Sequence, residues 1–159
     1  MRGLLLNCKR IEEIASKIYK QLAGDSNYAN EVRKVFQKLT DDEKAHARNF
    51  DLLLQANENE IEATHTLAWE KVNEALELAE RMLKKVETVK LNEENALRLA
   101  VDMEQHFVRV HVHNALFFRD QKLADLFNKL GSEDEAHLDT LRECLKWWHA
   151  ERKQVLQGR

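Results

Sequence analysis

The chain has 159 residues, of which 43% are hydrophobic, so it is long enough for one domain with a buried core over residues 1–159. Its formal net charge of −3 gives no basic field that would attract nucleic acid or an acidic membrane. No apolar run approaches the roughly 18 residues of a membrane span, and the first apolar stretch is too short for a secretory signal. Two distant cysteines without a CxxC pair indicate a reducing, cytoplasmic setting.

Helices are expected throughout, because proline is absent, glycine occurs only four times and no strand pattern is present. The first predicted helix covers residues 7–23, and the second begins after the following turn and ends at residue 56. A shorter helix is predicted at 66–86, and two further long helices at 93–118 and 121–153. Gly24 is expected in a left-handed conformation after the first helix, and Gly131 marks a soft point in the last. Caps are expected at Asn92 for the fourth helix and, for the second, at one of Asp25, Ser26 and Asn27.

The chain contains two copies of one motif. The segment VFQKLTDDEKAH (35–46) aligns without gaps to LFNKLGSEDEAH (126–137). Upstream, Glu12 precedes His46 by 34 residues, and Glu104 precedes His137 by 33. The sequence therefore predicts two helical hairpins of the same design, joined by residues 57–91, in a four-helix bundle with approximate two-fold symmetry.

Each of the four long helices carries acid on its apolar stripe. The second is the clearest example, because Glu43 and His46 occupy stripe positions between Leu39 and Phe50. The other three stripes place Glu12, Glu104 and the pair Asp134 and His137 at a similar level.

Four carboxylates in a dry core would be strongly unfavourable and would repel one another. They must be protonated, hydrogen-bonded or neutralised, and apart from histidine these stripes contain no basic partner. Two divalent cations would balance the four charges, with two neutral imidazoles as further ligands. One Glu from each of two helices, with an acid-x-x-His pair from each of the other two, is a ligand set of di-iron bundles. The alternatives are a bundle with buried hydrogen bonds, or a relic that no longer binds metal.

The chain resembles the ferritin-like superfamily, and within it the rubrerythrin-like branch, over nearly its whole length. The segments that carry the resemblance are IEEIASKIYKQLA (11–23), FQKLTDDEKAH (36–46), ALRLAVDMEQH (96–106) and FNKLGSEDEAH (127–137). The resemblance implies an all-α, ferritin-like antiparallel bundle whose long crossover contains an extra helix. It also implies a di-iron centre, with Glu12 and Glu104 as outer carboxylates, Glu43 and Asp134 as bridges, and His46 and His137 as end ligands.

Three departures from the family pattern limit what carries over. The fourth carboxylate is Asp134 where the family usually has Glu, so the bridge is expected to be looser or one iron weakly held, and Glu133 is the alternative ligand. Rubrerythrins have an extra Glu at the position of Phe107, which puts the specialised peroxide-reducing mechanism in doubt. The rubredoxin-like module is absent from this sequence, so peroxide turnover would need an external electron donor.

Several neighbouring residues have a predicted role of their own. Tyr19 and His111 lie seven residues after Glu12 and Glu104, and each is expected to donate a hydrogen bond to a carboxylate, with direct ligation as the alternative. Cys8 and Cys144 are expected to be buried inert thiols, at the same end of the bundle if their helices are antiparallel. His106 and His113 are expected at the surface, and one of Trp147 and Trp148 at a dimer contact.

The sequence thus predicts a non-haem protein with two iron ions, or manganese as the alternative metal, that reacts with O2 or H2O2. The reaction would be of the ferroxidase or peroxidase type, with an external electron donor; oxidation of an organic substrate would require a channel. The protein is expected to be a homodimer. The rival hypothesis is a metal-carrying or metal-free helical interaction protein without turnover, which dimerises through the crossover helix and the Trp pair.

Overall fold

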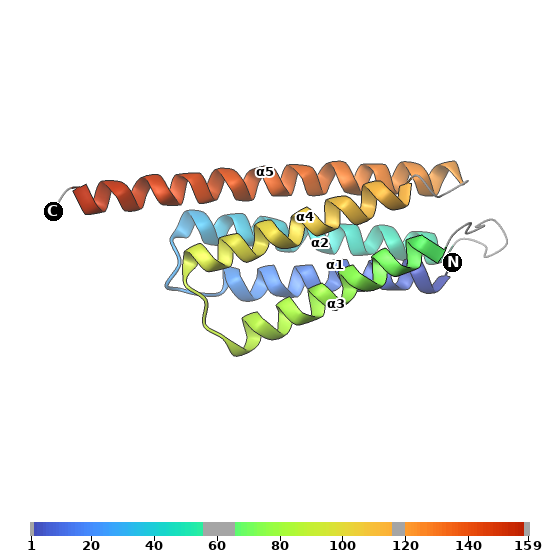
Figure 1. Cartoon of the computed structure of the whole chain (residues 1–159), viewed down its shortest axis with the longest axis horizontal. Helices are drawn as coiled ribbons and strands as arrows, with labels where there is room; N and C mark the ends of the chain where they lie inside the picture. Colours follow the sequence, from blue (N-terminus) through green and yellow to red (C-terminus); the bar gives the residue numbers. More distant parts are fainter. Residues whose placement is uncertain (1, 56–65, 116–119, 158–159) are drawn as a thin grey trace.

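The computed structural model describes residues 2–55, 66–115 and 120–157, and this part of the chain contains helices and no strand. Five helices follow one another: α1 (Arg2–Ala23), α2 (Asn30–Gln55), α3 (Thr66–Thr88), α4 (Glu93–Ala115) and α5 (Gln121–Gln157) (Figure 1). The all-helical prediction is confirmed. The predicted connection at 57–65 and the predicted end of the fourth helix at 118 lie outside the described residues.

The helices form two antiparallel hairpins, α1 with α2 and α4 with α5, which pack into a four-helix bundle (Figure 1). Helix α3 runs back along the length of the bundle, packs mainly on α1 and returns the chain to the end where α4 begins. As a result α1 and α5 run in one direction, and α2 and α4 in the other. The expected arrangement of two hairpins joined by a helix-containing crossover is confirmed.

The apolar stripes predicted from the sequence form the core of the bundle. In α2, Val32, Phe36, Leu39 and Phe50 are fully buried, which is what residues at steps of three and four on one helical face require. The other helices contribute stripes of the same kind, from Leu4 and Leu5 in α1 onward. The buried stripes hold the four long helices side by side and fix which side chains face the bundle axis.

Three helices are longer than predicted. Helix α1 begins at Arg2, because Leu4 and Leu5 are buried and Gly3 lies against the ring of Trp69 in α3. Helix α3 ends at Thr88, slightly beyond the predicted 86, and with 23 residues it is shorter than α2 with 26 and α5 with 37; α5 ends at Gln157, beyond the predicted 153.

The turn between α1 and α2 differs from the prediction. Gly24 does not adopt a left-handed conformation; instead its N–H donates to the carbonyl of Lys20 at 3.2 Å. The Asp25 carboxylate accepts from the backbone N–H of Asn27 at 2.9 Å, which closes a local turn, so α2 starts only at Asn30 and none of residues 25–27 caps it. The predicted cap of α4 is confirmed, because Asn92 Oδ1 accepts from the N–H of Asn95 at 2.8 Å.

Gly131 is a point of close helix packing and not a soft point, because α5 is continuous through it. A Cβ atom at this position would lie 2.8 Å from Cγ2 of Val112 in α4. The missing side chain therefore lets α4 and α5 approach each other in the second hairpin.

The two cysteines are free and buried. Helices α1 and α5 run in the same direction (Figure 1), and Cys8 is in the first half of α1 whereas Cys144 is in the second half of α5, so the two do not share an end of the bundle. The prediction that they share an end was wrong, since it assumed antiparallel helices. Burial raises the pKa of both thiols, to about 11 for Cys144, as expected for unreactive cysteines. Among the described helices, none is long and apolar enough to cross a membrane.

Gly131→Ala is expected to lower the free energy of unfolding by about 1 kcal/mol, since the contact with Val112 outweighs the gain in helix propensity. Chemical denaturation measures the change. Gly24→Ala is the matched control: its Cβ would meet only backbone oxygens at 3.4 and 3.5 Å, so a gain of about 0.5 kcal/mol is expected. A Gly131→Ala protein as stable as wild type would show that α4 and α5 can separate without cost.

Candidate metal centre

The predicted ligands converge at the centre of the bundle. Each hairpin brings one outer acid and one acid–histidine pair to the same level, and none of the six residues is more than 5% exposed: Glu12 from α1, Glu43 and His46 from α2, Glu104 from α4, and Asp134 and His137 from α5. Their assignment as ligands stays a prediction, but the structure brings all six together.

The ligand atoms fall into two overlapping groups. One ligand atom from each of Glu43, Glu104, Asp134 and His137 lies within 4.8 Å of the others, and the same is true of Glu12, Glu43 and His46. Glu43 belongs to both groups. Its Oε1 lies 3.1 Å from His137 Nδ1, and its Oε2 lies 3.1 Å from His46 Nδ1. This is the placement expected of a carboxylate that bridges two metal ions.

Several of these buried atoms have no partner in hydrogen-bond geometry. They are both oxygens of Glu12, one oxygen each of Glu43, Glu104 and Asp134, and Nδ1 of His137. Unsatisfied buried polar atoms are rare, and each requires an explanation such as an ion. Oxygen and imidazole donors that face one another in a closed space suit a divalent first-row metal. The donor set therefore fits a metal site.

The electrostatics lead to the same conclusion. Burial raises the pKa of Glu43 to about 7, although His137 and His46 oppose the shift. Burial likewise raises the pKa of Glu104, with Glu43 and Asp134 adding to the effect. His46 is buried, which would lower its pKa, but the neighbouring carboxylates of Glu12 and Glu43 raise it to about 12. Without a cation, this cluster compensates its negative charge by holding protons.

The roles predicted for Tyr19 and His111 stay predictions, but the structure brings both residues against the carboxylates. The Tyr19 hydroxyl donates to Glu104 Oε1. His111 Nδ1 lies 2.5 Å from Asp134 Oδ2, and its Nε2 lies 3.2 Å from Glu12 Oε1. Each residue thus contacts the outer carboxylate of the opposite hairpin, which accords with the predicted hydrogen-bonding role.

The structure separates the two candidates for the fourth carboxylate. Asp134 is 1% exposed and lies within the buried cluster. The Glu133 side chain is 39% exposed and belongs to neither group, although its Oε2 lies 3.1 Å from His46 Nε2. Asp134 is therefore placed among the predicted ligands, and Glu133 behind a histidine.

Asp42 was not predicted from the sequence, yet it holds the equivalent place in the first copy of the motif. Its Oδ2 lies 3.3 Å from His137 Nε2, as Glu133 lies near His46 Nε2. Histidines that bind metal through one ring nitrogen usually present the other N–H to a carboxylate. The signal was in the repeat: Asp42 and Glu133 both precede the motif acid, and each follows a lysine by four residues.

The other residues singled out from the sequence are two histidines, Phe107 and the Trp pair. His106 is exposed, as predicted, whereas the side chain of His113 lies outside the described residues. Phe107 is 1% exposed. Trp147 and Trp148 are both partly buried, and Trp148 Nε1 donates to Glu93 Oε2 at 2.5 Å. A dimer contact at the Trp pair stays a prediction.

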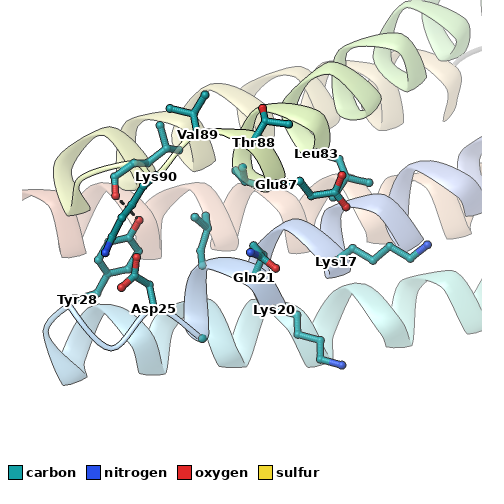
Figure 2. Close-up of a pocket in the computed structure, with 14 residues that line it drawn as sticks. Lys17, Lys20, Gln21, Asp25, Tyr28, Leu83, Glu87, Thr88, Val89 and Lys90 are labelled. Carbon is teal, nitrogen blue, oxygen red and sulfur yellow. Dashed lines mark hydrogen bonds between the residues drawn. The ribbon is translucent and has the colours of Figure 1, made fainter.

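Two surface grooves are separate from the predicted ligands. Figure 2 shows the first, of about 700 Å³, between the end of α1 and the loop after α3; Tyr28 crosses it by donating to the carbonyl of Leu91 at 2.9 Å. The second, of about 710 Å³, lies between α3 and α4 and is lined by Ala75 and Leu78, among others. Neither groove contains a predicted ligand, so neither forms a channel to the cluster.

A bundle of two helical hairpins with acids and histidines at its centre defines a protein of the ferritin-like carboxylate class. The family model for rubrerythrin matches residues 4–145, and the chain belongs to the rubrerythrin family. No curated protein and no solved structure matches the chain. The family and the ferritin-like fold predicted from the sequence are confirmed, and no rubredoxin module is indicated in the sequence.

The stability of the metal-free protein is expected to fall as the pH rises between about pH 5 and pH 8. The pKa values of Glu43 (about 7), His46 (about 12) and His111 (about 10) are raised, so the folded state binds protons that the unfolded state releases. The stabilisation by the protonated Glu43 is lost as the pH rises to the pKa that Glu43 has in the folded state. The stabilisation by the two histidines begins to fall once the pH exceeds the pKa of histidine in the unfolded chain. Thermal melting at several pH values tests this, and a Tm that rises over this range would contradict it. Bound metal should reverse the slope, because binding displaces the protons.

Asp42→Asn is expected to weaken metal binding about tenfold, because His137 Nε2 loses its carboxylate partner. Titration of the metal-free protein with Zn²⁺ against a competing chelator measures the effect. Asp41→Asn is the matched control: its side chain is 63% exposed and pairs with Lys44 on the surface, so no change is expected. Equal losses in both variants would point to a general charge effect and not to His137.

Proposed function

We propose that this protein is a non-haem di-iron oxidoreductase that reacts with O2 or H2O2. One observation carries the proposal: buried carboxylate oxygens without hydrogen-bond partners face two histidines at the centre of a rubrerythrin bundle. A helical protein without a metal function would gain stability by replacing such groups with apolar residues. The presence of these buried groups is best accounted for by two bound metal cations.

Two sets of residues would each hold one of the two ions. Glu12 and His46 would hold one ion, and Glu104, Asp134 and His137 the other, while Glu43 belongs to both groups of ligand atoms. When bound, iron supplies the electrons that reduce the oxidant. Tyr19 orients Glu104 through its hydroxyl, and His111 lies between Glu12 and Asp134 and orients both. These buried contacts keep the carboxylates in place while the charge at the centre changes.

A small oxidant suits this site better than an organic substrate. The six predicted ligands are at most 5% exposed, and neither surface groove contains one of them. The products of such a reaction are Fe(III) for storage or water from peroxide. Phe107 occupies the position of the additional rubrerythrin Glu, which favours the ferroxidase reaction. Peroxide turnover would require an external electron donor, and we place the reaction in a cytoplasmic homodimer.

The proposal is tested by loading the metal-free protein with Fe(II) under anaerobic conditions and then adding O2 or H2O2. We expect about two irons per chain, oxidised faster than free Fe(II), with an iron-dependent absorption in the near ultraviolet. Oxygen uptake and stopped-flow absorption measure the rates. Manganese in place of iron, after purification without chelator, would identify the alternative metal.

Glu43→Gln is the decisive variant, because Glu43 belongs to both groups of ligand atoms. It should lose most of the bound iron and the fast oxidation while remaining helical by circular dichroism. Glu13→Gln is the control, since that side chain lies on the surface beside Lys9. If wild-type protein binds no metal, or if Glu43→Gln retains it, the rival hypothesis of a helical interaction protein is favoured.

A further inference from the structure

We propose that the two metal positions are unequal, and that the position formed by Glu43, Glu104, Asp134 and His137 fills before the position formed by Glu12, Glu43 and His46. The proposal rests on the proposed metal function and adds an order of loading to it. The position with four donors is here called the tight position, and the position with three donors the weak position.

The first observation is the number of donors already placed together. Four side chains offer a ligand atom within 4.8 Å of one another at the tight position, and three do so at the weak position. Three carboxylates contribute at the tight position and two at the weak one. Affinity for a divalent cation rises with the number of charged ligands that are held in place.

The second observation is that the two copies of the motif no longer match at their acid. Glu43 directs one oxygen toward each histidine, at 3.1 Å in both cases. Asp134, its counterpart, is one methylene shorter. Its Oδ1 lies 3.9 Å from His46 Nδ1, and its Oδ2 is taken by His111 at 2.5 Å. Asp134 therefore has one oxygen left for metal, whereas both oxygens of Glu43 face histidines that are themselves predicted ligands.

The third observation explains why the shorter Asp134 side chain weakens only one of the two positions. Tyr19 and His111 are equivalent in the repeat, but Tyr19 contacts the outer acid Glu104 and leaves Glu43 untouched. His111 contacts both the outer acid Glu12 and the motif acid Asp134. A cation at the weak position must compete with His111 for Glu12 and lacks the second bridging oxygen. Oxygens without a hydrogen-bond partner lie at both positions, on Glu12 at the weak one and on Asp134 and Glu104 at the tight one, so the difference rests on the shorter Asp134 and on the place of His111.

Calorimetric titration of the metal-free protein with Mn²⁺, which is not oxidised during the experiment, tests the inference. We expect two binding steps, the second about tenfold or more weaker than the first. Glu12→Gln and Glu104→Gln form a matched pair, because the two residues are equivalent in the repeat. Glu12→Gln should remove only the weaker step, whereas Glu104→Gln should reduce the affinity of the tighter one.

His111→Phe supplies the second test, since its ring would remain between Phe50 and Phe127, the aromatic neighbours of His111. Asp134 is then free to present both oxygens, so the two affinities should approach each other. Circular dichroism and thermal melting establish that the variant is folded. An unchanged gap in folded His111→Phe would overturn the role assigned to His111.

The outcomes also separate this inference from the proposed function. Two equal binding steps in wild-type protein, or loss of the tighter step in Glu12→Gln alone, would overturn the order of loading and leave the metal centre intact. The absence of any Mn²⁺, Zn²⁺ or Fe²⁺ binding would overturn the metal centre and the order with it.

Discussion

The rest of the structure depends on the burial of carboxylates at the centre of the bundle. Glu12, Glu43, Glu104 and Asp134 are at most 1% exposed, in a place where an uncompensated charge costs several kcal/mol. Apolar packing above and below, from residues such as Phe36 and Phe127, closes the space around them. The helices hold the acids at the same level of the bundle, and there the acids must be protonated or bind a cation.

A duplicated hairpin supplies these acids and histidines twice from one design. Because the two copies have diverged in sequence, the two halves of the cluster differ in the side chains they offer to a cation. Each copy delivers an outer acid, a motif acid and a histidine, and each places a carboxylate behind the histidine of the other copy. The copies differ where one has Tyr19 and Glu43 and the other has His111 and Asp134. Because these four side chains are buried against the same cluster, two substitutions in one copy change how strongly each half attracts a cation.

Much of the site could be predicted from the sequence, because helical spacing alone places Glu43 and His46 on one buried face. The repeat then located Asp134 and His137, and the seven-residue offset located Tyr19 and His111. Other features depend on the tertiary structure. The direction of α5 relative to α1 follows from a crossover that spans the whole bundle, which spacing does not reveal, so Cys8 and Cys144 were placed wrongly. In the sequence Asp42 looks like an ordinary surface acid, because only the packing of α5 against α2 brings His137 beside it. The conformation of Gly24 is set by hydrogen bonds of the turn.

The contacts behind the histidines also connect metal binding to the assembly of the fold. Helices α2 and α5 belong to different hairpins and meet less closely than the helices within each hairpin. Across their interface, Asp42 faces His137 and Glu133 faces His46, while Glu43 lies between both imidazoles. In the metal-free protein these contacts depend on protonated histidines. A cation pair would hold the same helices through neutral histidines and ionised acids, so metal binding and hairpin association should stabilise each other.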